Sequence, residues 1–343
     1  MIAASGTREP RRLLPVARTV AAAALSLTLT TTAESSTASD QTALFRIGTG
    51  GLAGSYYPVG SVLAAELTDR LGVTCRVDCP AQPLFAVAQT SNGSVSNIAE
   101  LAARRLEAGL VQADIAHWAY SGEGIFSNGS PMQELRAIGH VYSESLQIVA
   151  RADTGIRALA DLRGKRVSLD EQGSGTLIAA RLVLEAHGLT ETDLEPRYVK
   201  PDLAIQKLRA GTLDAFFTVA GAPTASITAL ADDLQITLVP IEAAAQAELA
   251  SRVPFFLSAL LPAGLYRGTE PTKSLKVGAL MLTRADLNEE LVYQVTSVLW
   301  HDDTYAALQN GGAPVRRDMA LNGLPLPLHS GAKRFYRETG LLR

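Results

Sequence analysis

The sequence predicts an α/β fold in two lobes, and three observations support this prediction. The chain has 343 residues, 47% of them hydrophobic, which is enough for two α/β cores. Short apolar segments alternate with segments of helical periodicity, which favours a mostly parallel sheet. Two glycine-rich junctions, at residues 47–58 and 163–176, each join an apolar strand to a helical segment. Two such junctions suggest two lobes that face one ligand.

Residues 1–38 have the layout of a secretory signal peptide. Four arginines precede the apolar run 20–29, and small residues suited to cleavage follow at Ala33 and Ala38. A short membrane anchor is the alternative, but the run is short for a bilayer span and rich in Ala and Thr. We therefore expect an exported, periplasmic protein from which the signal peptide has been cleaved.

The charge of the exported chain argues against nucleic acid as a partner. Cleavage after Ala38 removes four of the 31 basic and two of the 34 acidic residues, which leaves 27 against 32 and a net charge of −5. An acidic protein is repelled by phosphate backbones and by anionic membrane surfaces. A small-molecule ligand is the expected alternative.

The chain has two cysteines, Cys75 and Cys79, four residues apart. In an oxidising compartment such a pair favours a local disulfide. A metal site is the alternative, but it would need further ligands, and the five histidines are scattered without metal-binding spacing. The sequence therefore predicts a Cys75–Cys79 disulfide, no metal site and no cofactor.

The first lobe is expected to begin after a polar leader that follows the signal peptide. Its first strand covers 43–48, and the spacing of apolar residues over 59–71 predicts a helix. Ser94 can cap a helix that runs to residue 102, because its hydroxyl can accept a hydrogen bond from a first-turn amide. Further strands are expected at 73–77 and 106–112.

The apolar segment 146–150 can pass as a strand from the first lobe to the second. The second α/β unit is expected to have strands at 166–169, 213–219 and 234–240, and helices at 176–187 and 202–209. Beyond Phe255 the chain is expected to return to the first lobe, with helices near 288–301 and 332–338. These crossings give a lobe I of residues 43–145 plus 251–343 and a lobe II of residues 146–250, joined by a hinge.

Candidate ligand-binding residues follow from where strands end. Ligands of open α/β sheets bind beyond the carboxyl ends of strands, so Gln112 and the turn 220–223 are expected to face the cleft. At the second junction, Ser174, Gly175 and Thr176 open a helix whose free amides and dipole favour a carboxylate or phosphate. The segment lacks the GxSxG nucleophile motif, and neither glycine loop is a P-loop, so no residue is assigned a catalytic role.

An ordered set of short segments resembles the TAXI family of TRAP transporter solute receptors. No single segment is specific, but the set covers almost the whole chain after the signal peptide. The matching segments are residues 47–58, 90–97, 111–114, 161–167 with 173–176, 214–217 with 221–223, 262–266, and 327–332. The sequence departs from the family at Ala113, where a Ser is common, and at Ser96, where a Glu is frequent, so side contacts are expected to differ.

The resemblance implies a periplasmic binding protein-like type II fold and no enzymatic activity. It implies that two lobes close around a small organic acid or amino acid, glutamate-like or a short dicarboxylate, and that a monomer presents it to membrane TRAP permease subunits. Carried over residue by residue, the expected ligand contacts are Gly51, Ser55, Tyr56, Thr90, Ser94, Gln112, Ser174, Gly175, Thr176, Ala220, Gly221 and Pro223.

Two other function classes stay open at this point. A ligand-sensing receptor for a membrane kinase would use the same cleft. An exported hydrolase with Ser174 as its nucleophile would need a base within hydrogen-bond reach of that hydroxyl.

Overall fold

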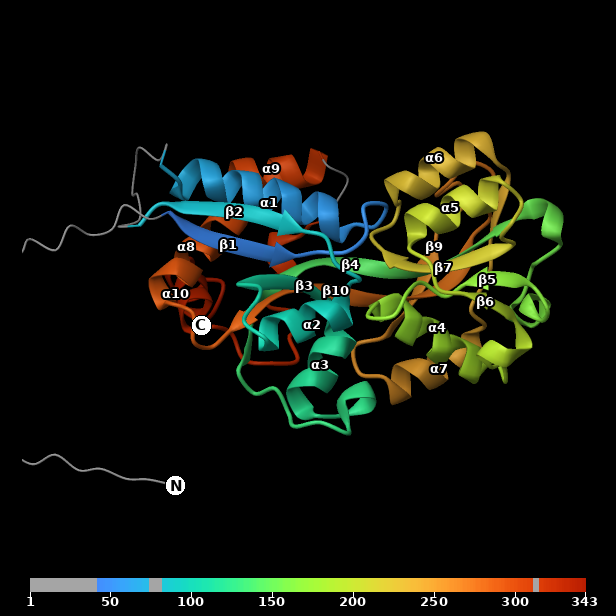
Figure 1. Ribbon diagram of the computed structural model, residues 1–343, viewed down its shortest axis with the longest axis horizontal. Helices are drawn as coiled ribbons and strands as arrows, with labels where there is room; N and C mark the ends of the chain where they lie inside the picture. The colour runs from blue at the N-terminus through green and yellow to red at the C-terminus, as the bar shows by residue number, and fades with distance from the viewer. Residues whose placement is uncertain (1–41, 74–81, 311–314) are drawn as a thin grey trace, which may run out of the picture. The chain divides into compact units, whose positions relative to one another are not determined.

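The computed structural model describes residues 42–73, 82–310 and 315–343 (Figure 1). The expected signal peptide at 1–38 and the expected Cys75–Cys79 disulfide lie outside these residues, and both stay predictions. Among the described residues, no helix combines the length and the apolar character needed to cross a membrane.

The strands of the described chain form one mixed sheet with the order β2-β1-β3-β10-β4-β7-β5-β6, while β8 pairs with β4 and β9 pairs with β10. Strands β1, β2 and β3 are parallel, and so are β5, β6 and β7, whereas β4 and β10 run antiparallel to their neighbours. The strands are β1 Ala43–Gly48, β2 Leu84–Gln89, β3 Ala108–Gln112, β4 Leu135–Arg151, β5 Arg166–Ser168, β6 Glu195–Arg197, β7 Ala215–Ala220, β8 Ile236–Leu238, β9 Leu257–Leu261 and β10 Thr272–Arg284.

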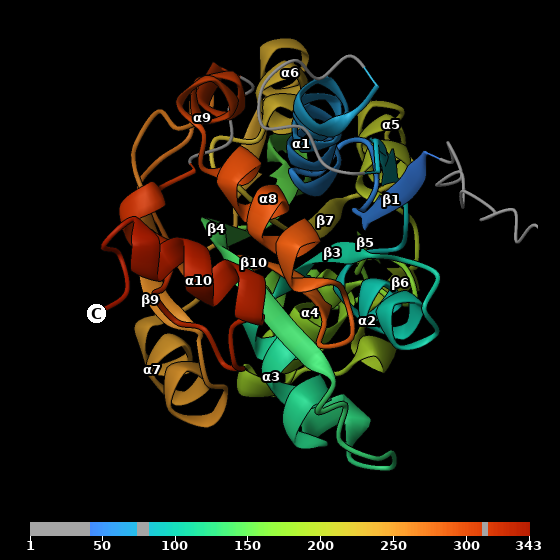
Figure 2. The same cartoon turned by 90° about the vertical axis from the view of Figure 1, so that its left-hand side faces the viewer.

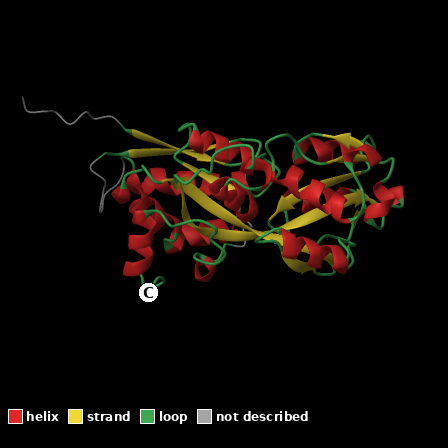
Figure 3. Ribbon diagram, turned by 90° about the horizontal axis from the view of Figure 1, so that it is seen from below, coloured by secondary structure: helices red, strands yellow, loops and turns green. Residues whose placement is uncertain are grey.

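Strand β4 connects the two groups of parallel strands. Its first part, from Leu135 to Ser145, pairs with β10, and its last part, from Ser145 to Ala150, pairs with β7. The sequence predicted the segment 146–150 as a strand between lobes, and this is the part that pairs with β7. Figure 3 shows long strands running through the middle of the molecule.

Helices cover both faces of the sheet (Figures 1 and 2). Side chains of α2, α3, α4 and α7 share one buried cluster, whereas those of α1, α8, α9 and α10 form a second and those of α5 and α6 a third. The helices are α1 Tyr56–Leu71, α2 Ser94–Ala102, α3 Ala113–Ser121, α4 Gly175–Ala186, α5 Pro201–Arg209, α6 Ala225–Asp233, α7 Ala243–Arg252, α8 Glu289–Leu299, α9 Asp302–Asn310 and α10 Ser330–Glu338.

Three sequence expectations differ from the structure. The sheet is mixed rather than mostly parallel, because β4 and β10 run antiparallel to the strands beside them. Val73 lies in a turn, and the strand that pairs with β1 is β2, Leu84–Gln89, rather than 73–77, most of which falls outside the described residues. Ser94 does not cap α2, because Gly93 holds the N-cap position with φ 111°, a backbone conformation that favours glycine. The Ser94 hydroxyl instead accepts a hydrogen bond from the backbone N–H of Gln112 at 3.1 Å.

Candidate ligand-binding site

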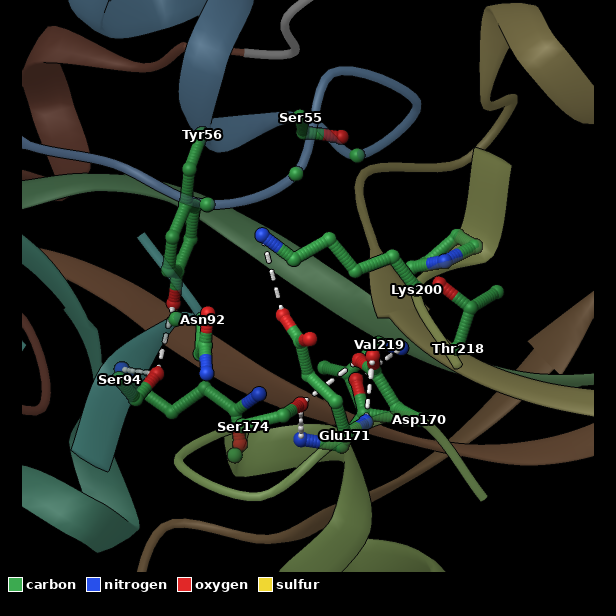
Figure 4. A pocket seen from close by; sticks show the side chains of 18 of the residues that line it. Ser55, Tyr56, Asn92, Ser94, Asp170, Glu171, Ser174, Lys200, Thr218 and Val219 are labelled. Carbon is green, nitrogen blue, oxygen red and sulfur yellow. Dashed lines mark hydrogen bonds and ion pairs between the residues drawn. The ribbon is translucent and has the colours of Figure 1, made fainter. Parts of the chain in front are cut away.

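A pocket lies where the loops after β1, β2, β5 and β6 meet the side chains of β3, β4 and β7 (Figure 4). We call it the central pocket. Its position agrees with the rule that open α/β sheets bind ligands beyond the carboxyl ends of strands. It is lined by Gly50, Gly51, Gly54, Ser55, Tyr56, Asn92, Gly93, Ser94, Gln112, Glu144, Asp170, Glu171, Ser174, Gly175, Thr176, Lys200, Pro201, Thr218 and Val219.

The central pocket brings together eight of the twelve residues expected from the sequence, namely Gly51, Ser55, Tyr56, Ser94, Gln112, Ser174, Gly175 and Thr176. The other four lie outside its lining. Thr90 is exposed in the loop after β2, and Ala220 is buried at the end of β7. The backbone N–H of Gly221 is directed at the Ser55 hydroxyl, and Pro223 lines a separate groove beside α6.

At the first junction, side chains are bound to other parts of the chain. Ser55 precedes α1 but makes no side-chain cap bond, and its Oγ accepts a hydrogen bond from Gly221 N at 2.9 Å. Tyr56 is 7% exposed, and its hydroxyl donates to Glu144 Oε2 at 2.9 Å. Burial and the neighbouring Glu144 raise the pKa of Tyr56 well above its usual value, so Tyr56 remains a donor.

At the second junction, the hydroxyls are used within the protein. Ser174 Oγ accepts from Thr176 N at 3.0 Å and donates to Asp170 Oδ2 at 2.7 Å, so Ser174 is the N-cap of α4. Thr176 Oγ1 accepts from Val219 N at 3.1 Å. Both hydroxyls therefore have a partner in the folded chain, and their contact with an anionic ligand stays a prediction.

Four ionisable residues of the central pocket were not expected from the sequence, namely Glu144, Asp170, Glu171 and Lys200. Lys200 precedes α5, and its Nζ lies 3.2 Å from Glu171 Oε1, an ion pair that Figure 4 shows inside the pocket. Asp170 lies just after β5 and Lys200 opens a helix. Both residues therefore lie at a strand-to-helix junction, the same kind of position from which Ser174 was predicted.

The carboxyl groups of this region are strongly perturbed. Burial raises the pKa of Glu144 to about 8, with the charge of Asp114 adding to the rise and the Tyr56 hydrogen bond opposing it. Burial raises the pKa of Asp170 to about 6, against the hydrogen bond from Ser174. Asp114 lies in α3 outside the pocket lining, and burial raises its pKa to about 7. Within the described chain, neither of its carboxyl oxygens has a side-chain hydrogen-bond partner.

Hydrogen bonds join segments of the two expected lobes around the pocket. Besides the Gly221–Ser55 contact, Ser226 Oγ donates to Ala53 O at 2.7 Å. On the other side, Asn92 Nδ2 donates to Gln172 O at 2.9 Å and Ser96 N donates to Gly173 O at 3.0 Å. These bonds hold both glycine junctions against segments that are distant in sequence.

Many solved structures resemble this chain, and three of them follow. One described as a periplasmic transporter matches with a TM-score of 0.52 at 13% identity, over 87% of this chain and 94% of that chain. The alkanesulfonate-binding protein SsuA from Xanthomonas axonopodis pv. citri, bound to MOPS, matches with a TM-score of 0.46 at 18% identity, over 87% and 84%. A substrate-binding protein of an ABC uptake transporter from Streptococcus pneumoniae, with bound histidine, matches with a TM-score of 0.45 at 12% identity, over 78% and 91%.

The likeness to the periplasmic transporter shows a periplasmic binding protein-like α/β fold and confirms the fold class expected from the sequence. A family model matches residues 47–340, a range that contains both glycine junctions and the whole lining of the central pocket. The chain therefore belongs to the NMT1-like family.

Proposed function

We propose that this protein is an extracytoplasmic solute receptor. It binds a small organic acid or amino acid in the central pocket and delivers it to a TRAP-type secondary transporter in the membrane. The observation that carries the proposal is the composition of the pocket, which takes residues from both glycine junctions. A ligand there contacts residues 50–56 of the expected lobe I and residues 170–176 of the expected lobe II at once.

Closure of the two lobes provides the mechanism. A ligand that touches both lobes binds the closed arrangement better than an open one, and it shifts the population toward closure by that difference in affinity. The Gly221–Ser55 and Ser226–Ala53 hydrogen bonds join the expected lobes, and in this mechanism they form when the lobes close. A membrane partner can then recognise the loaded receptor by its closed shape.

The proposed compartment and the proposed membrane partner are both inferred from the sequence. The layout of residues 1–38 supports export to the periplasm, and the ordered TAXI-like segments support TRAP permease subunits as the partner. The match to the NMT1-like family and the fold shared with a periplasmic transporter agree with this assignment.

A receptor fits the pocket better than a hydrolase does. Ser174 Oγ is held as a helix cap between Thr176 N and the Asp170 carboxyl group. Asp170 does lie within hydrogen-bond reach of this hydroxyl, but it belongs to the same junction and fixes the cap, and the described residues that line the pocket include no histidine to act as a base. The polar groups at this junction therefore serve to shape a binding site.

A thermal-shift screen followed by calorimetry tests the proposal. Protein freed of co-purified ligand by refolding is mixed with amino acids, dicarboxylates and keto acids of two to six carbons. A compound present at 100 times its Kd should stabilise the folded state by about 3 kcal/mol. No stabilisation by any compound of these classes would contradict the proposed ligand class.

Gly51→Leu provides a variant with a blocked pocket, and Gly129→Leu is its control. A Cβ on Gly51 would lie 3.7 Å from Lys200 Cδ, at ordinary contact distance, and the rest of the leucine would narrow the pocket. Gly129 is exposed in a loop outside the pocket lining. Gly51→Leu should lose the ligand-induced stabilisation, whereas Gly129→Leu should keep it.

A further inference from the structure

The central pocket contains more buried carboxyl groups than cations. Lys200 is the only cationic residue among the described residues that line it, and it is paired with Glu171. Glu144 is 1% exposed and Asp170 is 7% exposed, and within the described chain neither of them is paired with a cation. A buried carboxylate without a cation is costly and tends to become neutral instead. The pocket therefore holds two carboxyl groups, those of Glu144 and Asp170, that no cation of the described chain neutralises.

A second observation points to the same missing group. Gln112 lines the pocket and is 3% exposed, and its Oε1 has no hydrogen-bond partner in the described structure. The Gln112 amide lies against Gly175, where an added Cβ would come within 2.8 Å of Oε1. An unpaired buried acceptor calls for a donor. A ligand ammonium group supplies three N–H donors and the missing charge together.

The same pocket also contains groups that can bind a ligand carboxylate. The Lys200 ammonium group and the first turn of the 12-residue helix α4 can both face an anion. Lys200 has a flexible stem, so it can leave Glu171 for a ligand carboxylate. The pocket thus offers both acceptors and donors to a ligand.

We propose that the central pocket selects a zwitterionic α-amino acid, with Glu144 and Gln112 Oε1 holding its ammonium group and Lys200 its carboxylate. This inference rests on the proposed receptor function and names its ligand class. A keto acid or dicarboxylate of the same length brings only negative charge to Glu144 and Asp170. Such compounds bind more weakly because the carboxyl groups stay without a cation.

Proton release accompanies binding in this arrangement. Glu144 is faced by Tyr56 from α1, Tyr142 from β4 and Asp114 from α3, and these groups supply no positive charge. With its pKa at about 8, Glu144 is protonated in the empty pocket at neutral pH, whereas the ammonium complex needs the carboxylate. Affinity for an amino acid therefore rises with pH between about 6 and 8.

The test is calorimetry with two matched ligand pairs, L-glutamate with 2-oxoglutarate and L-alanine with pyruvate. Wild type, Glu144→Gln and the control Glu195→Gln are titrated at pH 6.5 and pH 8.5. The amide introduced by Glu144→Gln keeps an acceptor for Tyr56 but carries no charge, while Glu195 lies exposed on β6 with Arg197. In at least one pair, the amino acid should bind wild type on the order of 10-fold or more tightly than its keto acid.

Glu144→Gln and its control Glu195→Gln should then differ in their affinity for the amino acid. Glu144→Gln should weaken the amino acid on the order of 10- to 100-fold at pH 8.5 and remove its pH dependence, with little effect on the keto acid. Glu195→Gln should match wild type. As a further variant, Asp114→Asn removes the neighbouring charge that raises the pKa of Glu144. It should move the pH dependence to lower pH without any contact to the ligand.

The outcomes also separate this inference from the receptor function. The ammonium subsite is overturned if the keto acid binds as tightly as its amino acid and Glu144→Gln leaves the affinity for the amino acid unchanged or raises it. The receptor function is not contradicted by that result. Affinity for an amino acid that does not change between pH 6.5 and 8.5 also overturns it. If no amino acid, keto acid or dicarboxylate of the wider screen binds wild type, the proposed function fails together with the subsite.

Discussion

The two glycine-rich junctions of this protein are built from similar sequences but are held in different ways. In the second junction, Ser174 caps its own helix and binds Asp170 four residues earlier. In the first, Ser55 caps nothing and accepts its hydrogen bond from Gly221, 166 residues away. The Ser174 side chain is thus held by its own junction, whereas the Ser55 side chain depends on the turn after β7. In a receptor that opens, Ser55 is the junction serine that loses its partner, whereas Ser174 keeps both of its own.

The largest effect is expected when the internal support of the second junction is removed. Asp170 has φ 70°, a conformation that side chains other than Asp and Asn adopt poorly, and its carboxyl group accepts from Ser174 Oγ and Glu171 N. Asp170→Ala should lower the free energy of unfolding by about 2–4 kcal/mol, because it removes both hydrogen bonds and places alanine at positive φ. Urea denaturation at pH 8 measures this change.

Asp170→Asn is the matched control. Asn tolerates positive φ and keeps an acceptor, so Asp170→Asn should lower the free energy of unfolding by no more than about 1 kcal/mol. Burial raises the pKa of Asp170 to about 6, above its value of about 4 in the unfolded chain. The stability that this group gives at low pH is therefore lost as pH rises from about 4 to 6. Asp170→Asn should remove that part of the pH dependence, and equal losses for the two variants would contradict the account.

A smaller loss is expected from the cap alone. Ser174→Ala removes the acceptor for Thr176 N and one donor to Asp170, so the free energy of unfolding should fall by about 1–2 kcal/mol. Ser130→Ala, at an exposed serine in a loop, should change it by less than about 0.5 kcal/mol. A Ser174→Ala variant as stable as Ser130→Ala would mean that α4 does not depend on this cap.

Much of the fold could be predicted from periodicity and strand-to-helix junctions. Strand β1 was placed at its observed bounds, and helices α4 and α5 to within one residue at each end, because apolar spacing and the glycines that follow define them. Strand β4 was found only over its last residues. Its earlier part includes polar residues such as Glu144, which a local pattern does not identify as buried because their partners come from α1 and from β10.

The sequence predicted most of the uncharged residues of the candidate site, which lie at strand ends, but it did not predict the charged residues. Glu144 lies within a strand, and only the folded structure shows that it is buried and accepts a hydrogen bond from Tyr56. Asp170 and Lys200 do follow strands, so the carboxyl-end rule could have found them. The turn 220–223 follows a strand as well, yet Gly221 is bonded to Ser55 and lies outside the lining. A strand end therefore indicates where a residue lies, while the side-chain contacts decide whether it reaches the pocket.

The smallest effect on stability, and the most specific to closure, is expected at the first junction. Ser55→Ala removes the acceptor of the Gly221 N–H, a contact between the expected lobes, so its cost falls on the closed state alone. One neutral hydrogen bond of about 1 kcal/mol changes the ratio of closed to open molecules about 5-fold and ligand affinity by a similar factor. Small-angle scattering of the ligand-free variant should therefore give a larger radius of gyration than wild type, while urea denaturation shows a loss of at most about 1 kcal/mol. Ser174→Ala is the matched control. The Ser174 hydroxyl binds only within the second junction, so its removal should leave the radius of gyration unchanged.

If Ser55→Ala scatters as wild type does and binds ligand with wild-type affinity, the Ser55–Gly221 contact does not control closure. The difference between the two junctions is then one of local structure only.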